Sequence, residues 1–274
     1  MTVVLISVLL VLGLGAVFGV ILALASHFFA VKADERAQEI LAVLPGANCG
    51  GCGYTGCANY AEALAAGKAK PNLCAPGGKE VAEKLADLVG GDGAVEVKKA
   101  HVLCGGTASH VGIKMDYQGV PTCAAAAGYF GGQKDCRFAC LGFGDCVAGC
   151  AFGALSVVDG VAVVDKAKCT GCTTCVARCP KHIITMLPAE RPVAVVECQN
   201  HDKGAVVRKT CTAGCIACQK CVRTCPAGAI AMRDNLAVVD PDKCTGCGKC
   251  IDACPVHCIA FNCASLLTNA SEAV

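Results

Sequence analysis

The stretches CTGCTTCVARCP, residues 169–180, and CTGCGKCIDACP, residues 244–255, decide the fold of this chain. Each has three cysteines spaced three residues apart, followed by a fourth cysteine directly before proline. A third copy of the pattern, CIACQKCVRTCP, occupies residues 215–226. Three thiols so close in sequence can reach the corners of one inorganic core, because only a short loop separates them. The pattern therefore predicts metal sites built on cysteine-rich loops.

A duplication surrounds these loops, because eight cysteines each have a counterpart 75 residues later. The first copy contains Cys136, Cys140, Cys146, Cys150, Cys169, Cys172, Cys175 and Cys179, and the second contains Cys211, Cys215, Cys221, Cys225, Cys244, Cys247, Cys250 and Cys254. Between the loops, residues 154–165 and 229–240 each predict two short strands joined by a tight turn, at Asp159-Gly160 and at Asp234-Asn235. The repeat therefore predicts two copies of one small module.

The loop pattern is that of a bacterial two-cluster ferredoxin, in which the fourth cysteine of each run holds the neighbouring 4Fe-4S cluster. This cross-over rule predicts four ligand sets. They are Cys215, Cys218, Cys221 with Cys254; Cys244, Cys247, Cys250 with Cys225; Cys169, Cys172, Cys175 with Cys150; and Cys136, Cys140, Cys146 with Cys179. In the last set we expect Cys136 to act as a ligand because Phe143 stands where the later repeat has Cys218. Its counterpart Cys211 is then left over.

A further group of cysteines lies nearer the N-terminus, in NCGGCGYTGC, residues 48–57. Cys49, Cys52 and Cys57 are followed by Cys74, and four cysteines in this order can enclose one 4Fe-4S cluster. Zinc is the alternative, since four-cysteine zinc sites also begin with C-x2-C. The third cysteine follows closely, which favours iron-sulfur and gives a fifth predicted cluster.

Cysteine makes up 26 of the 274 residues, whereas tryptophan is absent. So many cysteines indicate disulfides in a secreted chain and metal ligands in a cytosolic one, and the crowded spacing favours metal. The clusters would then replace the missing aromatic core. Six cysteines are left over: Cys104, Cys123, Cys198, Cys211, Cys258 and Cys263. The sequence leaves open whether these are small buried residues or whether four of them hold a sixth cluster.

Residues 1–31 carry no formally charged side chain. A bilayer core needs about 20 apolar residues in a helix, so this stretch predicts one transmembrane anchor. A cleaved signal peptide is the alternative, but a basic n-region is missing and the apolar run is too long. Because thiolate clusters are assembled and kept reduced in the cytoplasm, we expect the cysteine-rich remainder on the cytoplasmic side of the inner (plasma) membrane.

The whole chain therefore predicts an α+β protein with an N-terminal transmembrane helix, a small 4Fe-4S domain and two tandem bacterial-type two-cluster ferredoxin modules. We expect an anchor at 1–31, a 4Fe-4S cluster domain at 32–90, a connecting region at 91–135, ferredoxin-like modules at 136–190 and 191–264, and a C-terminal tail at 265–274. Within the connecting region, residues 94–104 predict a strand. A net charge of +2 argues against nucleic acid as a partner.

The order of these parts resembles the B subunit of the Rnf electron transport complex. The resemblance rests on the uncharged N-terminal helix, NCGGCGYTGC with its distant Cys74, the segment CRFACLGFGDCVAGC at 136–150, and the two modules. It implies a membrane complex that oxidises reduced ferredoxin, reduces NAD and translocates sodium or protons. This subunit would accept electrons from soluble ferredoxin and relay them toward the other membrane subunits, with no catalytic residue of its own.

Two other classes of protein share part of the pattern. A polyferredoxin that serves a hydrogenase or another dehydrogenase would have the same modules, but it would not need residues 1–31. A scaffold held together by zinc would have four-cysteine sites and no redox activity. The chain shows no Ser/His/Asp arrangement, phosphate-binding loop or dinucleotide fingerprint, so the sequence favours electron transfer over bond chemistry.

Overall fold

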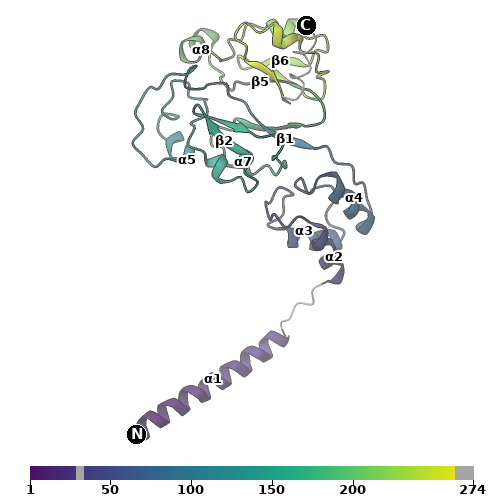
Figure 1. Cartoon of the computed structure of the whole chain (residues 1–274), viewed down its shortest axis with the longest axis vertical. Helices are drawn as coiled ribbons and strands as arrows, with labels where there is room; N and C mark the ends of the chain where they lie inside the picture. Colours follow the sequence, from purple (N-terminus) through teal and green to yellow (C-terminus); the bar gives the residue numbers. More distant parts are fainter. Residues whose placement is uncertain (29–33, 263–274) are drawn as a thin grey trace.

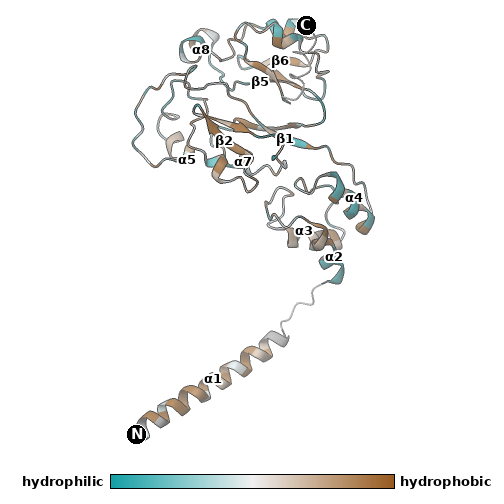
Figure 2. Ribbon diagram, in the orientation of Figure 1, coloured by the Kyte–Doolittle hydropathy of each residue, from teal (hydrophilic) through white to brown (hydrophobic). Residues whose placement is uncertain are grey.

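The computed structural model describes residues 1–28 and 34–262, and its first element is helix α1, Thr2–Phe28 (Figure 1). A 20-residue stretch of α1, Ile6–Ala25, is long and apolar enough to cross a membrane. Figure 2 shows apolar residues along the whole helix. A helix without a polar face suits lipid on all sides. The last residues of the predicted anchor, 29–31, lie outside the described residues, as do Cys263 and the predicted tail.

Three helices form the small domain that follows: α2, Glu35–Val43; α3, Cys57–Ala65; and α4, Gly78–Val89. Their apolar faces meet around Ile40, Tyr60, Leu64 and Leu85, which are almost fully buried. The Tyr60 hydroxyl donates to the carbonyl of Lys70 at 2.6 Å and accepts from the Leu73 amide at 3.3 Å. Tyr60 thereby fixes the loop that leads to Cys74.

The first ferredoxin-like module contains two antiparallel strand pairs. Strand β2, Leu155–Val158, pairs with β3, Val161–Val164, and β1, Lys98–Val102, pairs with β4, Ile184–Pro188. The short helices α6, Asp145–Ala148, and α7, Thr174–Arg178, follow the cysteine loops. The predicted strand within 94–104 is confirmed as β1. We expected it in a connecting region, whereas its pairing with β4 makes it part of the module.

The second module has the same plan. Strand β6, Ile230–Arg233, pairs with β7, Leu236–Val239, and β5, Ala194–Val196, pairs with β8, Ile259–Phe261. Helices α9, Lys220–Thr224, and α10, Lys249–Asp252, follow its cysteine loops, and α8, Gly204–Thr210, precedes them. Figure 1 shows the two modules side by side.

Both predicted hairpins are confirmed. The turn residues Asp159, Gly160, Asp234 and Asn235 all have positive φ, from 45° to 73°. Two successive residues with positive φ form the turn whose twist matches that of the paired strands. Each hairpin packs its inward residues against the cysteine loops, so cysteine side chains form part of the core of each module.

The two modules differ in the segment between the first strand and the first cysteine loop. In the first module this segment is longer and contains helix α5, Cys123–Ala127. Two isolated bridges hold it, Ile113 with Lys134 and Val111 with Cys211 of the second module. The segment therefore packs against both modules.

Candidate iron-sulfur sites

Every cysteine that the structure describes is a free thiol. The disulfide interpretation of the cysteine content therefore does not hold for residues 1–28 and 34–262. In the same ranges, no group of three or more His, Cys, Asp or Glu side chains converges closely enough for a single metal ion. The cysteines line cavities instead, and this spacing suits a larger inorganic core better than one zinc ion.

The first site lies in the helical domain and gathers Cys49, Cys52, Cys57 and Cys74. Burial raises the pKa of the Cys74 thiol, and the neighbouring thiolates of the other three raise it further. The side chain of Asn48 accepts a hydrogen bond from the Cys57 amide at 2.8 Å and thereby holds the loop against the start of α3. The structure thus brings together the four residues that the sequence predicts.

The second module contains two sites, and both group their cysteines as the cross-over rule predicts. Burial raises the pKa of Cys221 to about 11, with further contributions from its close neighbours Cys215, Cys218 and Cys254. Burial likewise raises the pKa of Cys250 to about 11, and its close neighbours are Cys244, Cys225 and Cys247. Each group therefore takes its fourth thiol from the other cysteine run.

One site of the first module also follows the rule. One pocket is lined by Cys150, Cys169, Cys172 and Cys175. Backbone amides point at two of these sulfurs, since Ala154 donates to Cys150 Sγ at 3.4 Å and Ala100 donates to Cys169 Sγ at 3.5 Å. Ala100 belongs to β1, so this strand contributes directly to the site.

The other site of the first module corrects the prediction. Cys140, Cys146 and Cys179 line one pocket, and the fourth thiol that lines it is Cys123 and not Cys136. Burial raises the pKa of Cys146 to about 12, and Cys140, Cys123 and Cys179 are the thiols that add to it.

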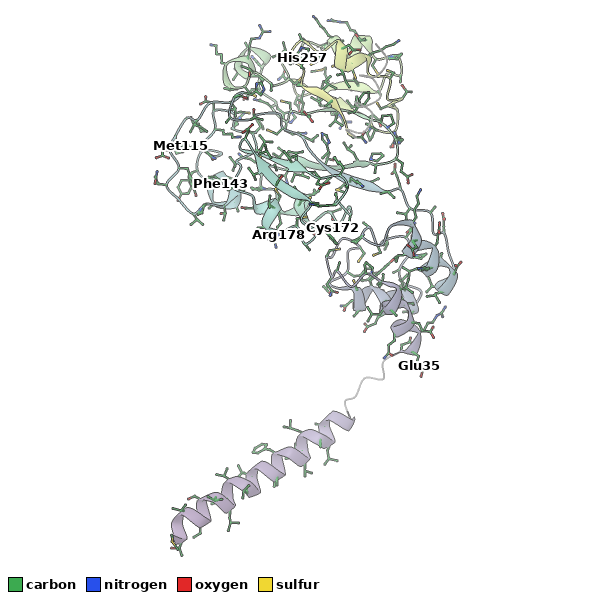
Figure 3. The ribbon with its side chains drawn as sticks, in the orientation of Figure 1. Glu35, Met115, Phe143, Cys172, Arg178 and His257 are labelled. Carbon is green, nitrogen blue, oxygen red and sulfur yellow. The ribbon has the colours of Figure 1, made fainter. Side chains whose placement is uncertain are left out.

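The physical reason for this correction is the Asp145 carboxylate. It accepts hydrogen bonds from the amides of Cys123 and Ala124, at 2.8 and 2.9 Å. Such charge-assisted bonds are strong, and they fix the start of α5 beside Cys146. Cys123 thereby supplies the thiol that is missing at Phe143, which Figure 3 labels beside this region.

Cys136 lies in a group that the sequence does not predict. One pocket is lined by Cys104, Cys136, Cys198 and Cys211. The buried Asn200 donates from its side chain to Cys136 Sγ and from its backbone to Cys198 Sγ, each at 3.4 Å. Three of these four cysteines were left over in the sequence, and we call this group the bridging quartet.

Cys258 is a fifth thiol at one site of the second module. It is buried, and its sulfur lies 3.7 Å from Cys254 Sγ. Its hydrogen bond with Cys215 raises the pKa of Cys258 and lowers that of Cys215 to about 6. Cys258 therefore contacts two cysteines of this site, and among the described residues it joins no further group of four.

The donor sets fit iron-sulfur clusters. Burial raises the pKa of several of these thiols, for example that of Cys175 to about 11 and that of Cys198 to about 12. Such thiols stay protonated near neutral pH unless a cation replaces the proton. The cavities are apolar, and backbone amides donate to several of the sulfurs. Hydrogen bonds of this kind tune iron-sulfur clusters.

Neighbouring sites are in direct contact. A Cβ atom on Gly51, in the first cysteine loop, would lie 2.7 Å from the carbonyl oxygen of Cys172, so the two loops touch; Figure 3 shows Cys172 on the side of its module that faces the helical domain. The Cys140 amide donates to Cys104 Sγ at 3.4 Å. In the same way the Cys215 amide donates to Cys198. The bridging quartet thus connects the two modules.

These features define an iron-sulfur electron-transfer protein with an apolar N-terminal helix. Family models agree: a model of the FeS family of Fe-S cluster domains matches residues 44–76, and models described as 4Fe-4S dicluster domains match residues 168–230 and 214–258. The first of these dicluster models spans the end of one module and the beginning of the next.

Similar proteins identify the family. Over 232 residues the chain is 41% identical to the B subunit of the Na(+)-translocating ferredoxin:NAD(+) oxidoreductase complex of Acetobacterium woodii, across 84% of this chain and 69% of that protein. Over 240 residues it is 43% identical to the B subunit of the ion-translocating oxidoreductase complex of Methanosarcina acetivorans, across 87% and 90%. Over 246 residues it is 40% identical to the B subunit of the proton-translocating ferredoxin:NAD(+) oxidoreductase complex of Clostridium ljungdahlii, across 89% and 86%.

The chain belongs to the family of B subunits of the ion-translocating ferredoxin:NAD oxidoreductase, or Rnf, complex. It is the iron-sulfur subunit of this membrane-bound translocase. The resemblance that the sequence motifs suggested is therefore confirmed.

Proposed function

We propose that this subunit accepts electrons from reduced ferredoxin and relays them toward the membrane subunits of the complex, using six 4Fe-4S clusters. A 4Fe-4S cluster supplies one-electron redox chemistry when it is bound. The cysteines hold the clusters, the apolar cavities exclude water from them, and the backbone amides donate to their sulfur ligands. The observation that carries this proposal is that six groups of four thiols follow one another through the fold.

The proposed ligand sets keep four of the five predicted groups. The fifth becomes Cys123, Cys140, Cys146 and Cys179, and the bridging quartet is the sixth. The four sets that remain as predicted are Cys49, Cys52, Cys57, Cys74; Cys150, Cys169, Cys172, Cys175; Cys215, Cys218, Cys221, Cys254; and Cys225, Cys244, Cys247, Cys250. The contacts between neighbouring sites favour one continuous path from the second module through the bridging quartet to the loop beside α3.

The path and the anchor support a membrane orientation. The helical domain follows α1 directly in the sequence, so its site is the one nearest the anchor along the chain. We propose that α1 spans the membrane once and that residues 34–262 lie on the cytoplasmic side, where soluble ferredoxin and NAD are found.

We also propose that the first module begins at β1 and the second at β5, because each of these strands pairs with the last strand of its module.

Iron and sulfide quantitation on the full chain, purified without oxygen, tests the number of clusters. We expect Cys104→Ser and Cys211→Ser each to remove one cluster's worth of iron and one electron paramagnetic resonance signal. Ala82→Ser is the control, because Ala82 is buried in α4 but lies outside the six groups, and it should keep all of the iron. Full iron content in Cys211→Ser would refute the sixth cluster.

Membranes that lack this subunit test its role in the complex. We expect them to lose ferredoxin-dependent NAD reduction and to regain it when the wild-type chain is restored. A complex that reduces NAD at the normal rate without this chain would contradict the proposed relay.

A further inference from the structure

Lys134 is a buried cation between two of the cysteine sites. Its side chain is almost fully inside the protein, with 4% of the residue exposed. The ammonium donates to the carbonyl of Gly106 at 2.9 Å and to the carbonyl of Gly160 at 2.8 Å. Among the residues that the structure describes, no carboxylate forms an ion pair with it. An ammonium held only by neutral groups is costly to bury, so a negative partner is expected nearby.

The two carbonyls place the ammonium beside two different sites. A Cβ atom on Gly106 would lie 3.4 Å from Cys104 Sγ and 3.8 Å from Cys211 Sγ, so this contact reaches the bridging quartet. Gly160 is in the β2–β3 turn, two residues before Ala162, whose amide donates to Cys140 Sγ at 3.4 Å. That contact reaches the site of Cys140.

The backbone fixes the position of Lys134, since the Lys114 amide donates to the Gln133 carbonyl at 2.8 Å and the Asp135 amide donates to the Gly112 carbonyl at 2.9 Å. The ammonium is therefore held in place and does not swing on a flexible surface loop.

We propose that Lys134 is a positioning residue for electron transfer, a shared counter-charge that raises the reduction potentials of two neighbouring clusters. These are the cluster of the bridging quartet and the cluster at Cys123, Cys140, Cys146 and Cys179. The inference rests on the proposed function. A four-thiolate cluster is anionic and gains one more negative charge on reduction. A buried positive charge stabilises the reduced form more than the oxidised form, and the low dielectric of the interior strengthens this effect.

One charge between two sites affects both in the same direction. The potentials of the two clusters are raised together, so the charge leaves the difference between them unchanged. Each cluster then accepts an electron more readily than it would without this charge. Lys134 thus affects the potentials of the bridging quartet, which connects the two modules, and of the neighbouring site in the first module.

Potentiometric titration of the full chain, purified anaerobically in detergent and followed by electron paramagnetic resonance, tests this inference. We expect Lys134→Met to keep the wild-type iron content and to shift two clusters per chain to more negative potential. At a solution potential that half-reduces these two clusters in the wild type, the ratio of reduced to oxidised form should fall about tenfold, which corresponds to about 59 mV for one electron.

Three control variants distinguish the effect of the Lys134 charge from the effect of its side-chain shape. Lys114→Met removes an exposed lysine of the same backbone ladder, one that donates only to the Phe130 carbonyl, and it should leave all potentials unchanged. Lys134→Arg keeps the charge and should keep the two potentials near those of the wild type, while Lys134→Gln should repeat the shift of Lys134→Met.

Unchanged potentials in an iron-loaded Lys134→Met protein would overturn the inference. An equal shift in Lys134→Arg, or loss of iron in both neutral variants, would also overturn it by showing a role in shape or folding. In each case a wild-type protein with its full set of clusters would leave the proposed function standing. A wild-type protein without clusters would refute the proposed function itself.

Discussion

At the scale of single residues, a cysteine's place in the sequence does not always give its place in a site. Cys136 lies only four residues before Cys140, and the repeat suggests that the two bind the same cluster. The structure separates them because Asn200 draws Cys136 toward the bridging quartet, whereas Asp145 draws Cys123 toward Cys146. Hydrogen bonds between residues far apart in sequence therefore determine which thiols meet.

Double variants distinguish the two arrangements. If Cys136 and Cys146 serve different clusters, Cys136→Ser combined with Cys146→Ser should remove two clusters' worth of iron. The combination of Cys123→Ser with Cys146→Ser should remove only one, because both cysteines belong to the same site and their effects do not add. Iron and sulfide per chain are the measurement. The opposite pattern would restore Cys136 to the site of Cys140.

The sequence predicts ligands well where the ligands are close together. The runs that begin at Cys169, Cys215 and Cys244 fold as expected, since a short loop with fixed spacing leaves few ways to enclose a core. The bridging quartet could not be predicted in this way. Its cysteines come from four separate segments, and only the tertiary fold brings them together. Phe143, which stands where the later repeat has Cys218, was the local signal that the site of Cys140 needed a thiol from another segment.

At the scale of elements, hairpins were predictable and the outer strand pairs were not. The β2–β3 and β6–β7 turns carry residues that favour positive φ, so the local sequence specifies the pairing. Strand β1 has no such signal, because its partner β4 lies about 80 residues further along the chain. That pairing moves the start of the first module forward and brings Ala100 to Cys169.

The cysteine loop of the helical domain contacts a cysteine loop of the first module, and a substitution at Gly51 can test the role of this contact. An alanine there would place its Cβ 2.7 Å from the Cys172 carbonyl oxygen, so the helical domain and the first module would have to separate. We expect Gly51→Ala to keep its iron but to weaken the magnetic coupling between the two neighbouring reduced clusters and to slow electron transfer between them.

Gly105→Ala is a suitable control for that experiment. Its added methyl group would lie 3.7 Å from the Ala213 side chain, an ordinary contact distance, and its φ is not in the left-handed region. It should therefore leave the coupling unchanged. Normal coupling and normal transfer rates in Gly51→Ala would show that the two loops do not need this contact.

At the scale of the whole molecule, the chain is divided between an apolar helix and a body that surrounds its cysteine sites. Helix α1 is apolar over its length, and none of its membrane-length window is buried against the rest of the described chain. The body has its own cores in the helical domain and in the two modules. Anchoring and cluster binding thus depend on different residues.

Removal of residues 1–33 tests this division of roles. We expect the shortened chain, expressed without the other subunits, to leave the membrane fraction and to keep the iron content of the full chain, because a 20-residue apolar span supplies the membrane affinity and contributes no cysteine. Membrane flotation and iron per chain are the measurements, with the full chain as the control. If iron were lost together with the helix, α1 would be part of the folded body. If the shortened chain stayed with the membrane, residues 34–274 would have to carry a second attachment, and the single-pass anchor would no longer account for where this subunit is held.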